Sequence, residues 1–276
     1  MCDADTDADN ARLSRRDFAL GASAASMAAL LPSPADAKAV TGRQVTIETA
    51  DGPAQAFYAA PKAGKHPAVL VWPDIMGLRP AFEGMATRLA ESGYAVLAVN
   101  QFHRSTKTPF TALPDARAKA MEWRKTLTPE ATTRDALAFA GWLDKQKEVD
   151  TRRPLASTGY CMGGPMTFLT AVALPARVRA IASFHGAGLV GDAAQSPDKL
   201  VPQLKGRALI AIAQNDDARA PGDKDALRAA FAAAKLPAEI EVYPANHGWC
   251  PPDSPAYDKT QAERAWTRQL ALLKGL

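Results

Sequence analysis

Short, uninterrupted apolar runs alternate along this chain with longer segments whose apolar residues recur every three or four positions. The short runs are typical of strands covered on both faces, and the spaced segments are typical of amphipathic helices. This alternation begins at residue 68 and continues to the C-terminal end. The expected strands cover residues 68–72, 94–99, 153–158, 178–184, 208–213 and 239–243. The expected helices cover residues 80–92, 129–147, 165–172, 223–235 and 254–274.

This order of elements predicts the fold class. Alternating strands and helices favour a mostly parallel central sheet with helices on both faces, which is an α/β architecture. Ahead of it, residues 45–49 and 55–59 flank Asp51-Gly52-Pro53, a turn sequence that predicts a β-hairpin. No internal repeat or low-complexity linker interrupts residues 38–276. We therefore expect a single domain there, with any ligand bound outside the carboxyl ends of the strands.

The first 37 residues differ from the rest in composition. They contain Ser14-Arg15-Arg16-Asp17-Phe18, then an Ala-rich apolar stretch, and they end in Ala35-Asp36-Ala37. Twin arginines, a moderately apolar segment and an Ala-x-Ala ending resemble a twin-arginine export signal. The apolar stretch is too short to span a bilayer. We expect export of residues 38–276 to the periplasm, with no membrane attachment after signal removal, although a disordered tail or an interfacial helix would also fit residues 1–37.

Charge and cysteine content exclude several functional classes. The chain has 33 basic and 29 acidic residues, a net charge of +4, and its basic residues are scattered rather than clustered. That distribution argues against nucleic-acid binding. The three cysteines form no Cys-x-x-Cys, and no His/Cys group has the spacing of a zinc site. We expect no cofactor and no metal, and a small molecule as the partner. The sequence leaves the oligomeric state open.

The most informative stretch is Gly159-Tyr160-Cys161-Met162-Gly163-Gly164, between an expected strand and an expected helix. Gly-x-Cys-x-Gly in that position is the pattern of a nucleophile elbow, with Cys in place of Ser. Glycine is needed where side chains would collide with neighbouring backbone in the tight turn. The helix N-terminus behind Cys161 stabilises a thiolate, and the Met162 N–H can bind an oxyanion.

An acid and a histidine follow two later strands. Gln214-Asn215-Asp216-Asp217 comes after residues 208–213, and His247 comes after residues 239–243. Nucleophile, acid and histidine in this chain order match the α/β-hydrolase order. His247 can accept a proton from Cys161 and return it to a leaving group, and an aspartate can fix its tautomer. We expect Asp217 in this role, with Asp216 as the alternative. His66, His103 and His185 remain candidates for structure or substrate contact.

These residues together resemble the dienelactone hydrolase family. The matching stretches are the cysteine elbow, Asp217 ahead of Pro221, His247-Gly248-Trp249, Asp74-Ile75-Met76-Gly77 and Ser183-Phe184-His185-Gly186, and the resemblance covers roughly residues 43–275. The resemblance implies an α/β-hydrolase fold. It also implies hydrolysis of an enol-lactone or related small ester by a Cys161-His247-Asp217 triad through an acyl-enzyme.

The resemblance also implies roles for residues outside the triad. The N–H groups of Met162 and Ile75 would form the oxyanion hole. Asp74 stands where the family usually has a Glu that contacts the nucleophile. Arg104 would be one of two arginines that hold a substrate carboxylate, and Pro251 stands at the position of the second. Half of that clamp is therefore missing from this sequence.

A second interpretation belongs to another functional class. Cys161 and Cys250 are the two cysteines outside residues 1–37, and an oxidising compartment would permit a disulfide between them. The chain would then be a non-catalytic exported binding domain of the same fold. A binding domain has no need of an aspartate and a histidine at matching strand ends, so we favour the enzyme.

Overall fold

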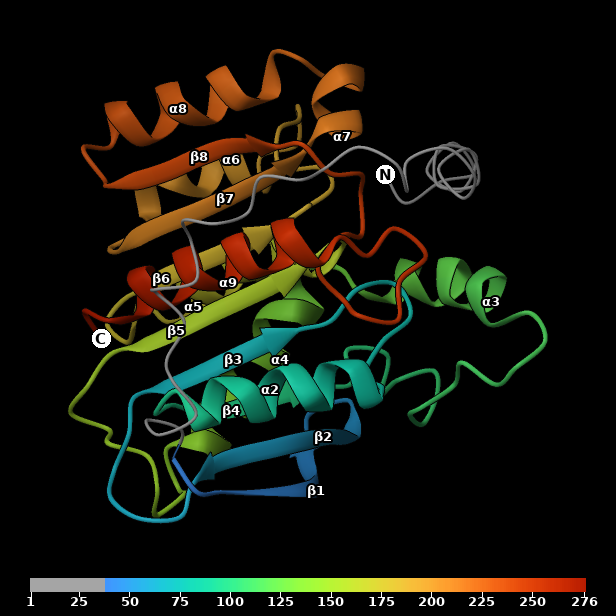
Figure 1. Ribbon diagram of the computed structural model, residues 1–276, viewed down its shortest axis with the longest axis vertical. Coiled ribbons are helices and arrows are strands. Elements are labelled where there is room, and N and C mark those ends of the chain that lie inside the picture. The colour runs from blue at the N-terminus through green and yellow to red at the C-terminus, as the bar shows by residue number, and fades with distance from the viewer. Residues whose placement is uncertain (1–37) are drawn as a thin grey trace.

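The apolar runs pair into one sheet of eight strands, in the order β1-β2-β4-β3-β5-β6-β7-β8 (Figure 1). The computed structural model describes residues 38–276, so the expected export signal at residues 1–37 lies outside the described residues. The first two strands pair antiparallel, β2 pairs antiparallel with β4, and the other neighbours are parallel. The strands are β1 (Val40–Thr49), β2 (Gly52–Pro61), β3 (Ala68–Trp72), β4 (Ala95–Val99), β5 (Leu155–Tyr160), β6 (Val178–Phe184), β7 (Arg207–Ala213) and β8 (Ala238–Tyr243).

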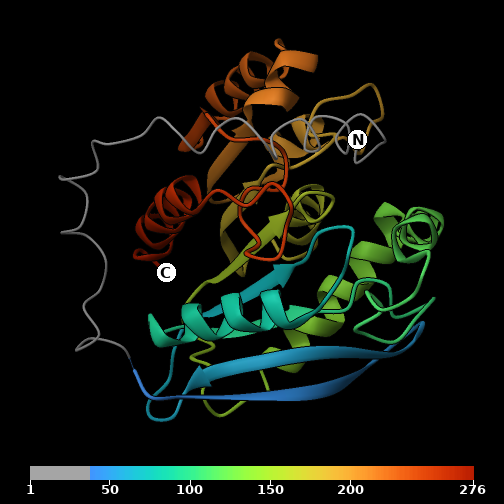
Figure 2. The ribbon, with the colours of Figure 1, turned by 45° about the vertical axis from the view of Figure 1, so that its right-hand side comes forward.

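The expected hairpin forms one edge of this sheet, and β8 forms the opposite edge, as Figure 2 shows. The β3, β4 and β5 strands are buried along their whole length, as expected for parallel strands between two layers of helices. The predicted α/β fold with a mostly parallel sheet is confirmed.

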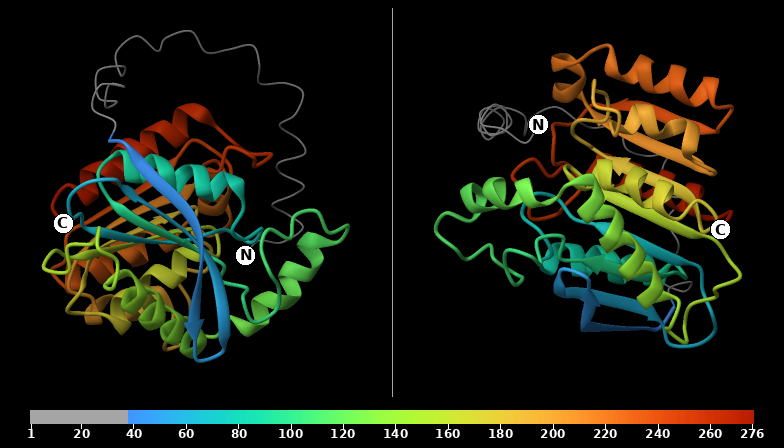
Figure 3. Two further views of the ribbon diagram at one scale, coloured as in Figure 1. Left: turned by 90° about the horizontal axis from the view of Figure 1, so that it is seen from below. Right: turned by 180° about the vertical axis from the view of Figure 1, so that it is seen from behind.

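Helices cover both faces of the sheet. Figure 3, seen from behind, shows α4, α5 and α8 on one face, and Figure 1 shows α2 and α9 on the other. Among residues 38–276, no helix is both long and apolar enough to cross a membrane. The α-helices are α2 (Pro80–Glu91), α3 (Ala116–Trp123), α4 (Pro129–Leu143), α5 (Gly163–Ala173), α6 (Pro197–Leu200), α7 (Gln214–Arg219), α8 (Asp223–Ala233) and α9 (Lys259–Leu273), with 3-10 turns η3 (Arg124–Thr126) and η4 (Val201–Gln203).

The two faces bury separate hydrophobic clusters. Leu70, Trp72 and Phe139 belong to the cluster under α4 and α5, where the Trp72 and Phe139 rings lie 5.7 Å apart. Val71 and Phe82 belong to the cluster under α2 and α9. Because successive residues of a strand point to opposite faces, neighbouring residues of β3 supply both clusters. This construction fixes the carboxyl ends of the parallel strands, where the chemistry-bearing residues lie.

Capping residues determine where two of the helices begin. The α9 helix begins at Lys259 rather than at residue 254, because the Asp258 carboxylate accepts a hydrogen bond from the Gln261 N–H and caps the helix. The Thr128 hydroxyl caps α4 in the same way, with Pro129 in the first turn. Three short helices, α3, α6 and α7, were not predicted from the sequence, and α7 alters the candidate site.

Candidate active site

Cys161 occupies a sharp turn between β5 and α5. Its φ angle is 53°, in the left-handed region that non-glycine residues rarely adopt. The turn requires glycine on both sides: a Cβ at Gly159 would lie 2.0 Å from the Gly163 carbonyl oxygen, and one at Gly163 would lie 2.3 Å from the Trp72 carbonyl oxygen. The sequence therefore forms the elbow that the glycine pattern predicts. The close approach to Trp72 also brings the elbow against the carboxyl end of β3.

Hydrogen bonds hold the backbone of Cys161 at the ends of two strands. Its N–H is shared between the Phe184 carbonyl oxygen, at 3.0 Å, and the Nδ1 atom of His185, at 3.1 Å. Its carbonyl oxygen accepts from the N–H groups of Gly164, at 3.0 Å, and Ala187, at 3.3 Å. The side chain lies at the N-terminus of the eleven-residue helix α5, where the helix dipole favours negative charge. Such a position suits a thiolate.

The acid beside His247 is Asp216, not Asp217. The Asp216 Oδ2 atom lies 2.6 Å from His247 Nδ1, whereas Asp217 pairs with the Lys224 ammonium group at 2.6 Å. The short helix α7 explains the difference, because successive residues of an α-helix point about 100° apart. Asp216 faces His247 and Asp217 faces α8. The sequence prediction of Asp217 as the orienting acid is wrong, and the alternative it left open is the one that the geometry supports.

His185 connects the cysteine to His247. It is fully buried, and its ring centroid lies 5.1 Å from that of His247 and 5.0 Å from that of Trp249. Because His185 Nδ1 accepts the Cys161 N–H, the ring proton sits on Nε2. Burial, and then the neighbouring His247, hold the pKa of His185 well below 6.5, so the ring is neutral. The sequence left His185 among several histidines with no assigned role, and its left-handed φ of 40° directly after a strand was not visible there.

Two backbone N–H groups point to an oxyanion site. Ile75 follows β3 and Met162 follows Cys161, and both are buried. Within residues 38–276, neither N–H has a hydrogen-bond acceptor in the protein. The close packing of the elbow on the Trp72 and Pro73 carbonyl groups brings these two segments together. Unpaired N–H groups beside a candidate nucleophile suit the negative oxygen of a tetrahedral intermediate.

Asp74 is held by an arginine rather than pointing at the cysteine. The Arg79 guanidinium donates to both carboxylate oxygens of Asp74, at 2.6 and 2.9 Å, and to both oxygens of Asp253, at 2.7 and 2.9 Å. The Asp74 carboxylate also accepts the Met76 N–H at 2.8 Å. None of these bonds joins Asp74 to Cys161, which is the contact that the resemblance implies. Asp74 instead shapes the turn that presents Ile75.

Arg104 lies in an ion-pair cluster outside the cavity described below. Its guanidinium donates to Asp51 at 2.5 Å and to the two oxygens of Asp135 at 2.7 and 2.8 Å. Hydrogen bonds from Arg104 and Arg134 lower the pKa of Asp51 to about 2. The predicted role of Arg104 in holding a substrate carboxylate is not supported, because both of its terminal nitrogens already bind protein carboxylates.

Cys250 cannot pair with Cys161 in this structure. It is a free and buried thiol in the cluster under α2 and α9, whereas Cys161 belongs to the cluster under α4 and α5. The sheet lies between these clusters. Burial raises the pKa of the Cys250 thiol, which leaves it protonated and unreactive. The Cys161–Cys250 disulfide considered for a binding domain is therefore wrong.

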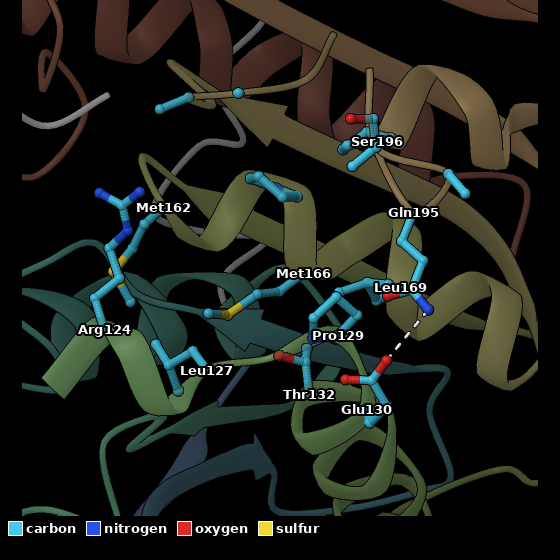
Figure 4. Close-up of a pocket in the computed structure, with 16 residues that line it drawn as sticks. Arg124, Leu127, Pro129, Glu130, Thr132, Met162, Met166, Leu169, Gln195 and Ser196 are labelled. Carbon is cyan, nitrogen blue, oxygen red and sulfur yellow. Dashed lines mark hydrogen bonds between the residues drawn. The ribbon is translucent and has the colours of Figure 1, made fainter. Parts of the chain in front are cut away.

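A cavity of about 730 Å³ adjoins the elbow. Figure 4 shows Arg124 and Met162 on one side of it, and Glu130 hydrogen-bonded to Gln195 on the other. No group of three or more metal-binding side chains occurs in the described part of the chain. Besides Met162, the apolar residues that line the cavity are Leu127, Pro129, Pro165, Met166, Leu169, Ala187, Ala193, Ala194 and Pro197.

Comparison with known proteins places this arrangement in a family. Residues 54–276 match the model of the dienelactone hydrolase family, which is more than half of the chain. The chain belongs to the dienelactone hydrolase family. It is similar to proteins named as carboxymethylenebutenolidases: 29% identical to one from Salmonella typhi, over 78% of this chain and 80% of that protein, and 28% identical to one from Methylorubrum extorquens, over 84% and 80%.

Solved structures agree with this membership. A Klebsiella pneumoniae protein described as a dienelactone hydrolase superimposes with a TM-score of 0.76 at 25% identity, covering 87% of this chain and all of that one. A dienelactone hydrolase-like promiscuous phosphotriesterase from metagenomic libraries gives 0.70 at 25% identity, covering 86% and 98%. The family and the α/β-hydrolase fold suggested by the sequence are confirmed, and this member of the family is an enzyme that cleaves carboxylic esters or lactones.

Proposed function

We propose that the enzyme cleaves small esters or lactones through an acyl-enzyme on Cys161. The thiolate sulfur attacks the carbonyl carbon, and the carbonyl oxygen becomes an oxyanion bound by the Met162 and Ile75 N–H groups. Collapse of this intermediate breaks the bond to the leaving alkoxide, which takes from His247 the proton that this histidine accepted from the Cys161 thiol. Water then loses a proton to His247 and attacks the thioester, which releases the acid and regenerates Cys161.

Asp216 serves this cycle by orienting His247. Its carboxylate accepts the Nδ1 proton, so the other ring nitrogen, Nε2, is the one that exchanges protons with sulfur, alcohol and water. It also stabilises the imidazolium that forms in each step. The observation that carries the proposal is the combination of a left-handed cysteine at the elbow and a histidine held 2.6 Å from an aspartate, with both histidine and cysteine contacting His185.

The substrate class follows from the relatives and from one correction. The relatives' name, carboxymethylenebutenolidase, denotes hydrolysis of a lactone, which favours a lactone or a small activated ester here. Arg104 is bound to Asp51 and Asp135, and Pro251 replaces the second arginine implied by the resemblance. A two-arginine clamp for a substrate carboxylate is therefore not part of the proposal.

The test compares variants of the nucleophile. Cys161→Ala should remove nearly all turnover of p-nitrophenyl acetate, because no atom remains to attack the carbonyl. Cys161→Ser should cost on the order of a hundredfold, about 2.7 kcal/mol of barrier, since the hydroxyl ionises far less readily than a thiol. Cys250→Ala is the matched control and should retain activity. Intact-mass spectrometry of the wild type during turnover should show one acyl group on Cys161, and full activity of Cys161→Ala would refute the mechanism.

We also propose that the enzyme is exported through the twin-arginine route and acts in the periplasm. Support comes from Ser14-Arg15-Arg16-Asp17-Phe18 and from Ala35-Asp36-Ala37. Replacing both Arg15 and Arg16 by Lys should leave the precursor in the cytoplasm, as measured by fractionation. Unchanged delivery of the double variant would exclude this route.

A further inference from the structure

The cavity beside the elbow opens next to the nucleophile. Met162, which directly follows Cys161, lines it, and so does Ala187, whose N–H donates to the Cys161 carbonyl oxygen at 3.3 Å. We propose that this cavity binds an elongated apolar acyl group, so that the enzyme prefers esters of medium-chain acids to esters of acetic acid. The proposal rests on the proposed function, because the sulfur of Cys161 is taken as the atom that receives the acyl group.

One face of α5 forms the apolar wall of the cavity. Pro165, Met166 and Leu169 lie within four positions of one another, which places them on neighbouring parts of one helix face. Leu127 approaches from the segment ahead of α4, and Pro129 is the first residue of α4 (Figure 4). Thioether and aliphatic side chains offer no hydrogen-bond acceptors that a polar acyl group would need, and methionine adapts to irregular apolar chains.

The charged groups of the cavity lie at its two sides, and Thr132 and Ser196 add two hydroxyl groups to its lining. Arg124 lies on the side of Met162 and is exposed to solvent. On the opposite side, the Glu130 carboxylate lies in the first turn of α4 and accepts a hydrogen bond from Gln195 at 3.3 Å. Hydrogen bonds from its own backbone N–H, then from Thr128 and Gln195, lower the pKa of Glu130, so it stays ionised. An acyl chain that runs between them contacts the α5 wall and meets no unpaired buried charge.

The size of the cavity gives the length preference. A volume of about 730 Å³ falls in the upper part of the range of roughly 300–1,000 Å³ that is usual for small-molecule sites. An acetyl group would leave most of it filled with water. Each methylene added to the acyl chain transfers apolar surface from water to the α5 wall, which should tighten binding about fourfold.

The experiment measures binding without catalysis. N-Methylacetamide, N-methylhexanamide and N-methyloctanamide are titrated into the full-length enzyme by calorimetry, since amides of this kind resist ester hydrolases. We expect the dissociation constant to fall about fourfold per methylene. The same series of p-nitrophenyl esters should show a parallel rise in kcat/KM.

Two bulky substitutions fill the cavity, each with a matched control elsewhere. Leu169→Trp and Ala194→Trp place an indole in it, the second from an exposed loop position where folding tolerates the change. Both should reduce two ratios at least tenfold: the affinity for N-methylhexanamide relative to N-methylacetamide, and the kcat/KM for the hexanoyl ester relative to the acetyl ester. Leu137→Trp on α4 and Ala232→Trp on α8 are exposed residues outside the cavity and should keep the wild-type ratio.

The outcomes separate this proposal from the proposed function. A dissociation constant that does not change with chain length, or a ratio that falls equally in the control variants, would overturn the cavity assignment even in an active esterase. Chain-length dependence in amide binding that disappears in Leu169→Trp would support the assignment even if the wild type hydrolysed no ester. Absence of ester hydrolysis by the wild type would overturn the proposed function and leave the cavity assignment standing.

Discussion

At the residue scale, the two consecutive aspartates of α7 have different partners. Asp216 contacts His247 and Asp217 contacts Lys224. We expect Asp216→Asn to lower kcat by at least a hundredfold, because an amide can present its N–H to Nδ1 and favour the wrong histidine tautomer. Asp217→Asn should keep kcat within about twofold of wild type, because Asp217 does not contact His247. Its partly exposed ion pair with Lys224 contributes at most about 1 kcal/mol to stability.

Steady-state kinetics on a single ester would check this pair of variants. The pH dependence of kcat/KM should also change in Asp216→Asn, because the free energy of the imidazolium depends on that carboxylate. A larger loss in Asp217→Asn than in Asp216→Asn would show that the geometry of α7 differs during turnover. It would restore the assignment made from the sequence.

Arg104 illustrates how a residue on a family motif can have a structural role. Asp135 is buried, with 2% of its side chain exposed, and Arg104 and His103 are its partners. Arg104→Gln should destabilise the fold by about 3 kcal/mol, because it leaves a buried carboxylate without its main cation. The ratio of kcat/KM for succinate monoesters to that for butyrate esters should not change.

Urea unfolding would measure the cost of this substitution, and Arg104→Lys should recover part of the stability. The opposite pattern, with unchanged stability and a selective rise in KM for the anionic ester, would return Arg104 to the substrate site. Sequence could not reveal the ion pairs of Arg104, because Asp51 and Asp135 are 53 and 31 residues away.

At the element scale, the β5–elbow–α5 unit is predictable because local rules agree there. The glycines, the preceding apolar strand and the proline in the first turn of the helix all indicate the same turn. The prediction is less accurate at the ends: β5 runs to Tyr160 rather than stopping at residue 158, because Gly159 and Tyr160 pair with Ser183 and Phe184 of β6. Strand pairing of this kind depends on a partner that the local sequence does not contain.

Gly159 tests the steric basis of this unit. Gly159→Ala would place a Cβ 2.0 Å from the Gly163 carbonyl oxygen and 2.4 Å from its carbon, both of which are backbone atoms. Backbone cannot move aside without opening the elbow, so we expect a loss of more than about 4 kcal/mol of stability or failure to fold. Gly141→Ala in α4 meets nothing within 4 Å and should instead gain about 0.5–1 kcal/mol.

Thermal and urea denaturation of the two glycine variants would provide the comparison. We expect the free energy of unfolding to fall in Gly159→Ala and to rise in Gly141→Ala, although the chemical change is the same. If Gly159→Ala folded with normal stability, the elbow would not have the close packing described above, and the left-handed conformation of Cys161 would need another explanation.

At the scale of the whole molecule, the sequence determined most of the fold but only part of the site. Alternating apolar runs predicted the sheet, and the order of Cys161 and His247 at strand ends predicted their convergence. Two interpretations of the sequence fail, each for its own structural reason. The acid was misassigned because α7 is too short to carry a helical pattern. The disulfide of the alternative interpretation does not form, because Cys250 packs on the other face of the sheet, which the sequence does not show.

The stability of the molecule should depend on pH through His185. Its pKa in the folded protein is depressed well below 6.5, first by burial and then by His247. The unfolded chain binds a proton at this residue below pH 6.5, but the folded protein does not. Stability is therefore complete above about pH 6.5 and decreases as pH falls toward the folded pKa, by about 1.4 kcal/mol per pH unit.

Two variants isolate this contribution. His185→Phe removes both the titrating group and the acceptor of the Cys161 N–H, whereas His185→Asn removes the titrating group and can still offer an oxygen to that N–H. Between pH 6.5 and 5, both should lose less stability than the wild type, as measured by urea unfolding. Only His185→Asn should retain substantial ester turnover, because it can still hold the elbow. Wild-type pH dependence in both variants would mean that the acid sensitivity comes from other groups, and equal activity of the two would mean that the bond to Cys161 does not position the nucleophile.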